Sequence, residues 1–221
     1  MRKLTGAAFV SLDGVIQAPG GPTEDRTGDF DQGGWVFGIG DDVINPVLGE
    51  LFKPPYALLL GRRTYDIFAA YWPFVEGEMA DMGGALSAAD KYVVTHGNQQ
   101  LGWANSYRVN SIAAIRTLKE SNGPDLLIQG SSTLYPPLLE AGLIDELVLM
   151  TFPVILGTGK RIFNDGTPSV SMRLLEHQVG EKGVIVTRWA PSGPIPTVEH
   201  PHPSTSAAEA ERQRRMNEGT W

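Results

Sequence analysis

The sequence predicts an α/β fold with a mostly parallel, helix-covered sheet and an antiparallel C-terminal edge. From residue 4 to residue 152, short apolar segments alternate with segments of helical spacing. That alternation is typical of parallel strands connected by helices. Beyond it, two apolar segments follow each other across Gly180-Glu181-Lys182, as in a hairpin. The antiparallel edge is therefore expected at the C-terminal end of the sheet.

The expected strands are apolar runs that end at glycine or small polar residues. They cover residues 4–12, 56–60, 91–95, 107–109, 126–129, 146–152, 172–178 and 183–189. Gly61 and Gly130 each follow such a run directly. Between the first strand and the first helix, residues 13–34 are rich in Gly, Pro and Asp. This segment is longer than most connecting loops, and long loops are often functional.

The expected helices show apolar residues at helical spacing between turn signals. They cover residues 41–52, 62–71, 79–88, 111–121 and 133–141. Asp41 and Asp42 suit the start of the first of these helices. Pro136 and Pro137 lie near the start of the last one. Since a helix tolerates proline only in its first turn, regular helix is expected to begin around Tyr135.

Composition restricts the function classes. The chain has 221 residues, of which 42% are hydrophobic, a net charge of -7 and no cysteine. The negative charge argues against a nucleic-acid partner, and without cysteine there is neither a disulfide nor a thiolate nucleophile. No signal peptide or membrane span is recognisable. A cytoplasmic protein without a membrane partner is expected.

The C-terminal part differs from the rest in composition. Residues 1–190 are expected to form one domain, and residues 191–221 a proline-rich arm. Residues 204–217 of the arm are polar and alanine-rich, and could form a short helix or a frayed terminus. The pair His200 and His202 is a poor ligand set, so no metal site is assigned.

Polar donors gather at two of the strand ends. Gly61-Arg62-Arg63-Thr64 follows one strand, and Gly130-Ser131-Ser132-Thr133 follows another. Free backbone N–H groups and the positive helix end favour an anion at such turns. Each turn alone also fits an ordinary helix cap. Together they suggest that a pyrophosphate is held between two helix starts, at the carboxyl edge where α/β proteins bind ligands.

Four segments in this order resemble the dihydrofolate reductase superfamily. They are SLDGVI, GRRTY, QGSSTL and LIDELVLMTFPVILGTGKRIF. The resemblance spans residues 2–189 and is closest to the reductase domain of bacterial riboflavin biosynthesis and its stand-alone relatives. It implies a three-layer fold with a mixed, mostly parallel sheet of eight strands. It also implies NADPH as the hydride donor and a homodimer.

The resemblance also implies roles for individual residues. The cofactor phosphates would contact Gly61, Arg62 and Thr64 on one side, and Gly130, Ser131, Ser132 and Thr133 on the other. Thr95 and His96 would lie by the adenosine ribose and its 2′-phosphate, with Arg63 nearby. Ala7 and Ala8 would leave room for the nicotinamide ring, over which the loop from Asp13 would close.

The substrate side is predicted to involve Asp13, Trp35, Tyr65 and Phe68. Asp13 could hydrogen-bond the substrate or pass a proton, or it could simply form the turn before Gly14. Trp35 could stack on a flat ring or anchor its loop. Tyr65 and Phe68, on one helix face, fit the core at least as well as a pocket.

Two departures from the family pattern concern the site. Folate-reducing members carry a carboxylate on the first helix shortly after a tryptophan. Here Asp41 and Asp42 follow Trp35 at a spacing that does not match cleanly. In addition, Gln129 stands where the family has the first glycine of its pair.

The sequence therefore predicts an NADPH-dependent reductase that transfers a hydride to a small heteroaromatic, carbonyl or imine substrate. Holding the two reacting groups together without water is what such a protein must do. The alternatives are a nucleotide-binding protein without catalytic activity and a dimeric interaction protein of the same fold.

Overall fold

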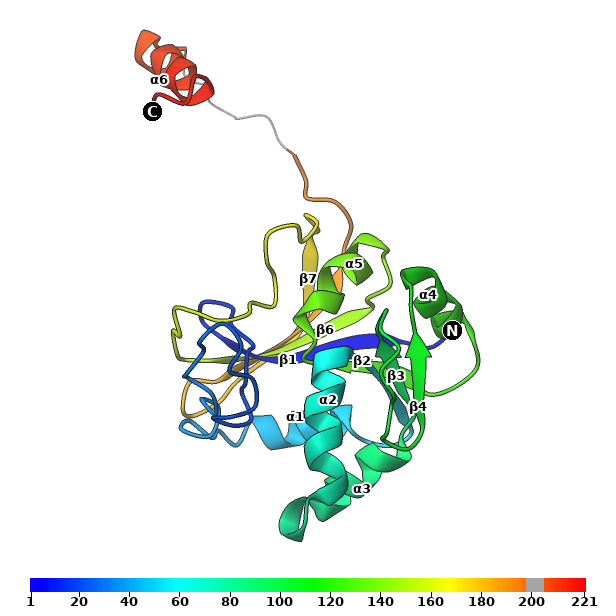
Figure 1. The fold of residues 1–221 in the computed structure, drawn as a ribbon. Coiled ribbons are helices and arrows are strands. Elements are labelled where there is room, and N and C mark those ends of the chain that lie inside the picture. Colours follow the sequence, from blue (N-terminus) through cyan, green and yellow to red (C-terminus); the bar gives the residue numbers. More distant parts are fainter. Residues whose placement is uncertain (198–204) are drawn as a thin grey trace.

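A computed structural model describes residues 1–197 and 205–221. Its centre is an eight-stranded sheet with the strand order β4-β3-β2-β5-β1-β6-β8-β7 (Figure 1). The eight strands expected from the sequence are all present, with bounds within a few residues. They are β1 Leu4–Ser11, β2 Tyr56–Gly61, β3 Lys91–Val94, β4 Ser106–Val109, β5 Asp125–Gln129, β6 Glu146–Phe152, β7 Met172–Val179 and β8 Ile185–Pro191.

The direction of the strands agrees with the predicted mixed sheet. All pairs from β4 to β6 are parallel. The pairs β6–β8 and β7–β8 are antiparallel. Hence β8 alone runs against the other seven strands, and the carboxyl ends of β1, β2, β3 and β5 meet at one edge.

Helices cover both faces of the sheet and give the expected three layers (Figure 1). On one face, buried residues of three helices join a core with Ala7, Leu58 and Leu60. On the other face, two helices pack on Leu4, Ala8 and Ile128. The first face carries α1 Ile44–Leu51, α2 Arg62–Tyr71 and α3 Ala80–Ala88; the second carries α4 Ile112–Glu120 and α5 Tyr135–Glu140.

The first helix starts later than predicted. The expected start at Asp41 is wrong, because the carboxylate of Asp41 accepts hydrogen bonds from Lys182 N at 2.8 Å and from Val184 N at 3.4 Å. This side chain therefore holds the β7–β8 turn, and the helix begins at Ile44. As a result, the connection between β1 and α1 is irregular from Leu12 to Val43, longer than the loop expected from the sequence.

The start of α5 agrees with the proline argument. Regular helix begins at Tyr135, with Pro136 and Pro137 in its first turn. Before it, the 3₁₀ helix η3 spans Ser132–Leu134, and Ser131 has a left-handed backbone with φ 57°. The segment that follows Gly130 is therefore a tight, open turn before the α-helix.

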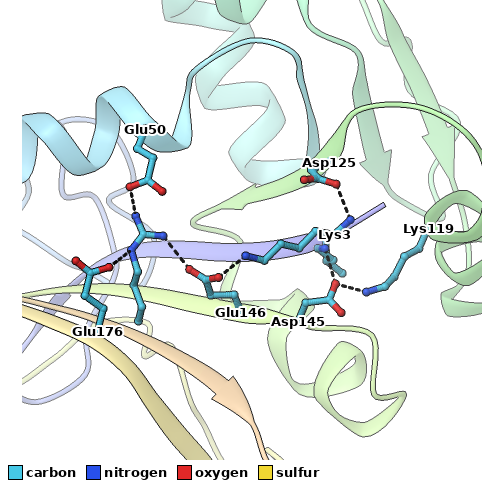
Figure 2. A network of polar contacts seen from close by, with 9 residues as sticks. Lys3, Glu50, Lys119, Asp125, Asp145, Glu146 and Glu176 are labelled. Carbon is cyan, nitrogen blue, oxygen red and sulfur yellow. Dashed lines mark hydrogen bonds and ion pairs between the residues drawn. The ribbon is translucent and has the colours of Figure 1, made fainter. Parts of the chain in front are cut away.

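Ion pairs lie near the amino ends of the central strands, at the end of the sheet opposite the glycine turns (Figure 2). Arg188 on β8 binds Glu146 on β6 at 2.8 Å and also pairs with Glu50 on α1. Glu146 in turn pairs with Lys3, which precedes β1. The side chains of Glu146 and Arg188 are largely buried, and breaking such a pair is costly. This network fixes the amino ends of the strands, away from the edge with the glycine turns.

The C-terminal arm is described only in part. The sheet extends to Pro191 in β8, one residue past the predicted domain limit. Helix α6 spans Ala207–Asn217 and is capped by Ser206, which accepts a hydrogen bond from Glu209 N at 3.1 Å. His200 and His202 lie outside the described residues. Among the described residues, no helix has the length and apolarity needed to cross a bilayer.

Candidate functional site

The two glycine turns predicted from the sequence are joined directly. Gly61 N donates a hydrogen bond to Ser131 Oγ at 2.9 Å, and Ser131 Oγ donates to Thr64 Oγ1 at 2.9 Å. This contact is possible because β2 and β5 are neighbours in the sheet, so their carboxyl ends lie side by side. The starts of α2 and η3 therefore form one surface.

The turn after β5 depends on an unusual backbone. Gly130 and the following Ser131 have φ values of 69° and 57°, a conformation that glycine adopts without strain but that costs energy for serine. Gly130 N donates to Ala7 O at 3.1 Å, which fixes the turn on β1. The N–H groups of Ser132 and Thr133 start a helix and so have no partner within it. Donors of this kind suit an anionic ligand.

A cavity of about 1020 Å³ opens from these turns. It lies on the face of the sheet that α1, α2 and α3 cover, and it is bounded by the loop after β1. Its wall includes Arg63 and Thr64 from the first turn, and Gly130, Ser131 and Ser132 from the second. This volume is at the upper end of the range for small-molecule and cofactor sites.

A charged contact fastens the loop over this cavity. The Asp25 carboxylate pairs with Lys160 and lies 3.9 Å from Arg63. Thr27 Oγ1 also donates to it, at 2.6 Å. Burial disfavours the ionised form of Asp25, but the hydrogen bonds from Lys160 and Thr27 outweigh it and hold its pKa below the usual value. Asp25 thus links the loop to α2 and to the segment after β6.

A second carboxylate of the loop faces the cavity, and it has no ion pair with the described residues. Glu24 lines it, and its Oε2 accepts a hydrogen bond from Gly20 N at 2.6 Å. Burial raises the pKa of this carboxyl group. Such a group holds its proton more readily than a free glutamate.

The structure divides the predicted cofactor residues into two groups. Arg63, Thr64, Gly130, Ser131 and Ser132 line the cavity, and Gly61 contacts it through Ser131. Thr133 lies within 3.8 Å of the position that a Cβ on Gly61 would take, so it belongs to the same cluster.

The second group lies beside the cavity, near the end of β3. It consists of Thr95 and His96, which follow β3, and Arg62 from the start of α2. Arg62 donates to Asp66 through Nε at 2.9 Å and to Gln99 O through Nη1 at 3.2 Å. Gln99 O also accepts from Arg108 Nη2 at 2.8 Å. Two arginines thus hold the loop after β3, in which Thr95 is buried and His96 exposed. Arg108 was not predicted, because its strand of four residues carries no turn motif.

Each of Arg62 and Arg63 lies at the position that was expected for the other. The guanidinium of Arg62 points to the loop after β3, where the 2′-phosphate was expected. Arg63 instead faces the loop after β1 and lines the cavity. Successive residues at a helix start point in different directions, and the sequence did not say which of the two points inward.

Two of the predicted substrate residues, Trp35 and Tyr65, have structural roles. Trp35 is 9% exposed, its Nε1 donates to Gln17 O at 2.9 Å, and its ring meets Phe152 edge-on. Tyr65 is 2% exposed and accepts a hydrogen bond from Trp103 N at 2.9 Å. Both thus follow the core alternative. Phe68 is the one aromatic of the set that lines the cavity.

Asp13 also has structural partners. Its carboxylate accepts from Ser11 Oγ at 2.7 Å, from Leu156 N at 3.1 Å and from Gly157 N at 2.9 Å. The hydrogen bond from Ser11 is the main cause that lowers its pKa. Within the described chain, the cavity lining does not include Asp13. This geometry fits the turn-forming alternative.

Ala8 faces away from the cavity. Strand alternation sends its side chain into the core under α5, whereas Ala7 and Phe9 face the cavity side. Of these β1 residues, Phe9 lines the cavity, whereas Ala7 is fully buried in the core.

Gln129 lies on the same face and was noted in the sequence only as a departure. It is the register partner of Ala7 and lines the cavity, and its Oε1 is buried without a hydrogen-bond partner among the described residues. An unpaired buried acceptor in a cavity wall is a position where a ligand donor fits.

The chain matches the model of one known protein family along most of its length. The model of the RibD C-terminal domain matches residues 2–186. The chain belongs to the RibD C-terminal domain family. This agrees with the superfamily that the sequence segments resemble.

Two curated proteins of Bacillus subtilis are similar to this chain in sequence. The uncharacterised protein YyaP of Bacillus subtilis is 25% identical over 187 residues, which cover 81% of this chain and 91% of YyaP. The uncharacterised protein YwjB of the same organism is 24% identical over 176 residues, which cover 78% of this chain and 89% of YwjB.

Solved structures share the fold of this RibD C-terminal domain member. A provisionally named riboflavin biosynthesis protein from Shewanella has a TM-score of 0.66 at 18% identity, over 86% of this chain and 99% of that one. Dihydrofolate reductase from Enterococcus faecalis, solved with NADP(H), has a TM-score of 0.55 at 15% identity, over 86% and 96%. These likenesses establish the fold.

Proposed function

We propose that this protein is an NADPH-dependent reductase that transfers a hydride to a carbonyl, imine or heteroaromatic carbon of a small substrate. The observation that carries the proposal is the Gly61–Ser131–Thr64 hydrogen-bond chain. It joins two helix starts at the carboxyl edge, and it does so at the wall of a cavity large enough for a dinucleotide and a second ring.

The donor set of the cavity fits a dinucleotide. Backbone N–H groups at the starts of α2 and η3, the hydroxyl groups of Thr64 and Ser132, and the guanidinium of Arg63 would hold the pyrophosphate. Arg62 and Arg108, which bracket the loop at Thr95 and His96, supply positive charge where a 2′-phosphate would lie. This charge favours NADPH over NADH.

When bound, the dinucleotide supplies the hydride, and the chain supplies position and shielding. The loop after β1, anchored by Trp35 and fastened by Asp25, forms one wall of the cavity and limits the access of bulk water to it. Asp13 holds the same loop to the segment after β6 through Leu156 and Gly157. The contribution of these groups to the reaction would therefore be positional.

The test is a calorimetric titration of the purified protein with NADPH and NADH. We expect saturable binding, with NADPH bound at least about tenfold more tightly than NADH. The Arg63→Ala variant should bind NADPH more weakly, whereas Arg26→Ala, at an exposed arginine of the loop after β1 that does not line the cavity, should bind it like the wild type. A protein that binds neither dinucleotide would refute the proposal.

One observation favours a second candidate, a nucleotide-binding protein without catalysis. Within the described residues, α1 presents no carboxylate to the cavity, whereas folate-reducing relatives are expected to have one there. NADPH binding without oxidation by any carbonyl or imine substrate would support this candidate.

We also propose a homodimer that forms through β7. This edge strand is exposed along its length, and Leu174, Leu175 and Val179 are 43%, 43% and 66% exposed. Exposed apolar edge strands tend to pair with another chain. Light scattering should give a dimer mass for the wild type and a monomer mass for Leu175→Lys. A monomeric wild type would contradict this part.

A further inference from the structure

Charge is distributed unevenly along the cavity. Its charged lining residues are Glu24, Asp25, Arg63, Asp66 and Lys160, which come from the loop, from the first half of α2 and from the segment after β6. The lining contributed by α1, α3, the second half of α2 and the residues directly beside these helices (Phe52, Trp72 and Met79) is uncharged. It consists of Leu48, Phe52, Ile67, Phe68, Ala70, Tyr71, Trp72, Met79, Met82 and Leu86.

The uncharged end is the part of the cavity that the dinucleotide donors leave free. The glycine turns and Arg63 lie at the charged end, so a second ligand would occupy the space between α1, α2 and α3. There, the rings of Phe68 and Trp72 pack edge to face with their centroids 6.2 Å apart, and Leu48 of α1 and Phe52, which follows α1, line the same cavity. Such walls suit a flat apolar molecule.

Two acidic residues near α1, Asp41 and Glu50, have partners outside the cavity. Asp41 is 6% exposed, and its carboxylate is bound to the backbone of the β7–β8 turn. Hydrogen bonds from backbone N–H groups hold its pKa low, although burial acts in the opposite direction. Glu50 pairs with Arg188 at the amino edge of the sheet (Figure 2). Neither carboxylate is available to a ring bound between α1 and α2.

The rim of this end is apolar as well. Phe37, Tyr71 and Met79 line the cavity and are 74%, 54% and 44% exposed. Large exposed apolar side chains at a cavity mouth mark a site for an apolar ligand. A substrate with a phosphate or several hydroxyl groups would have to lose water on these surfaces without polar partners.

We infer that the α1–α3 end of the cavity binds an uncharged, largely apolar ring compound with a reducible C=O or C=N group. Folates and phosphorylated ribityl-pyrimidines are then poor ligands. This inference rests on the proposed function, since it assigns the substrate class of the same site. In the reaction, the C=O or C=N carbon gains the hydride and the heteroatom takes a proton from water. The dinucleotide is oxidised.

Calorimetry on the protein saturated with NADP⁺ tests the inference without turnover. The probes are 1,4-naphthoquinone and dihydrofolate. Naphthoquinone should bind at least about tenfold more tightly than dihydrofolate. Tighter binding of dihydrofolate, or no binding of naphthoquinone, would overturn the inference. If NADP⁺ itself does not bind, the proposed function fails, and naphthoquinone binding to the free protein still reports on the apolar end.

Two leucines of α1 provide a matched pair of variants. Leu48 and Leu51 are both half-buried, but Leu48 lines this cavity and Leu51 does not. Leu48→Asn should weaken naphthoquinone binding at least about tenfold and leave NADP⁺ binding unchanged. Leu51→Asn should leave both unchanged. Equal losses in the two variants would mean that α1 acts only through stability, and would count against the assigned site.

Discussion

The backbone N–H of Gly61 and the hydroxyl of Ser131 are 2.9 Å apart, although 70 residues separate them in sequence. This hydrogen bond joins the end of β2 to the end of β5. It sets the distance between the two helix starts at the wall of the cavity. A ligand that contacts both turns therefore meets a surface that is already assembled.

Removing this link should weaken dinucleotide binding. Ser131→Ala loses the acceptor for Gly61 N and the donor to Thr64, and it leaves a buried N–H group unpaired. We expect NADPH affinity to fall about tenfold, which corresponds to about 1.4 kcal/mol. Calorimetric titration measures it.

Ser111→Ala is the control for this variant. The Ser111 side chain also accepts a backbone N–H, from Ala114 at 3.1 Å, but it caps α4 on the other face of the sheet. It should lower stability by about 1 kcal/mol and leave NADPH affinity unchanged. Unchanged affinity in Ser131→Ala would show that the link is not needed for binding.

Replacing Gln129 with methionine should raise the stability of the free protein and reduce the stabilisation by NADP⁺. Its buried Oε1 has no partner, so Gln129→Met should stabilise the free protein by about 1 kcal/mol. If a ligand donor pairs with that oxygen, the rise in Tm caused by NADP⁺ should be smaller in the variant. Thermal unfolding with and without NADP⁺ measures both effects. Gln178→Met on exposed β7 should change neither. An equal ligand-induced shift in wild type and Gln129→Met would contradict the pairing.

The Asp25 contact should control how long a ligand stays bound. Asp25→Asn weakens the pairing with Lys160 and Arg63 that fastens the loop. The dissociation rate of NADPH should rise about tenfold, with little change in association, because most mutational effects on affinity appear in dissociation. Stopped-flow displacement measures it. Asp29→Asn, an exposed residue of the same loop, should behave as the wild type. If both variants release NADPH at the wild-type rate, the loop is held by other contacts.

Asp41 should make stability depend on pH in the acid range. Burial raises its pKa, but hydrogen bonds from Lys182 N, Val43 N and Val184 N outweigh this, and the net pKa lies below 3.8. The unfolded chain therefore takes up the proton first as pH falls. The stabilisation is present above about pH 4 and is lost as pH falls through the lower folded-state pKa.

Urea unfolding of Asp41→Asn at pH 7 and at pH 3 checks this sign. The variant should unfold at lower urea than the wild type at pH 7, and the gap should narrow at pH 3. Asp42→Asn, the exposed neighbour, should unfold with the wild type at both values. A gap that is the same at both pH values would mean that the charge of Asp41 does not stabilise the β7–β8 turn.

The sequence by itself determined the fold class, the order of the elements and the two glycine turns. Strand and helix periodicity depend on local spacing, and a glycine after a buried strand has few conformational alternatives, so both can be read from neighbouring residues. The late start of the helix at Tyr135 followed in the same way from Pro136 and Pro137.

Only the tertiary structure decided which side chains meet in the cavity. Arg62 and Arg63 are adjacent in sequence, yet one turns to Gln99 and the other to Asp25. Asp41 was a natural helix-start residue, but its carboxylate is bound by a turn 141 residues away. These outcomes depend on contacts between distant segments, which are set by packing of the whole sheet. No pattern of local spacing contains that information.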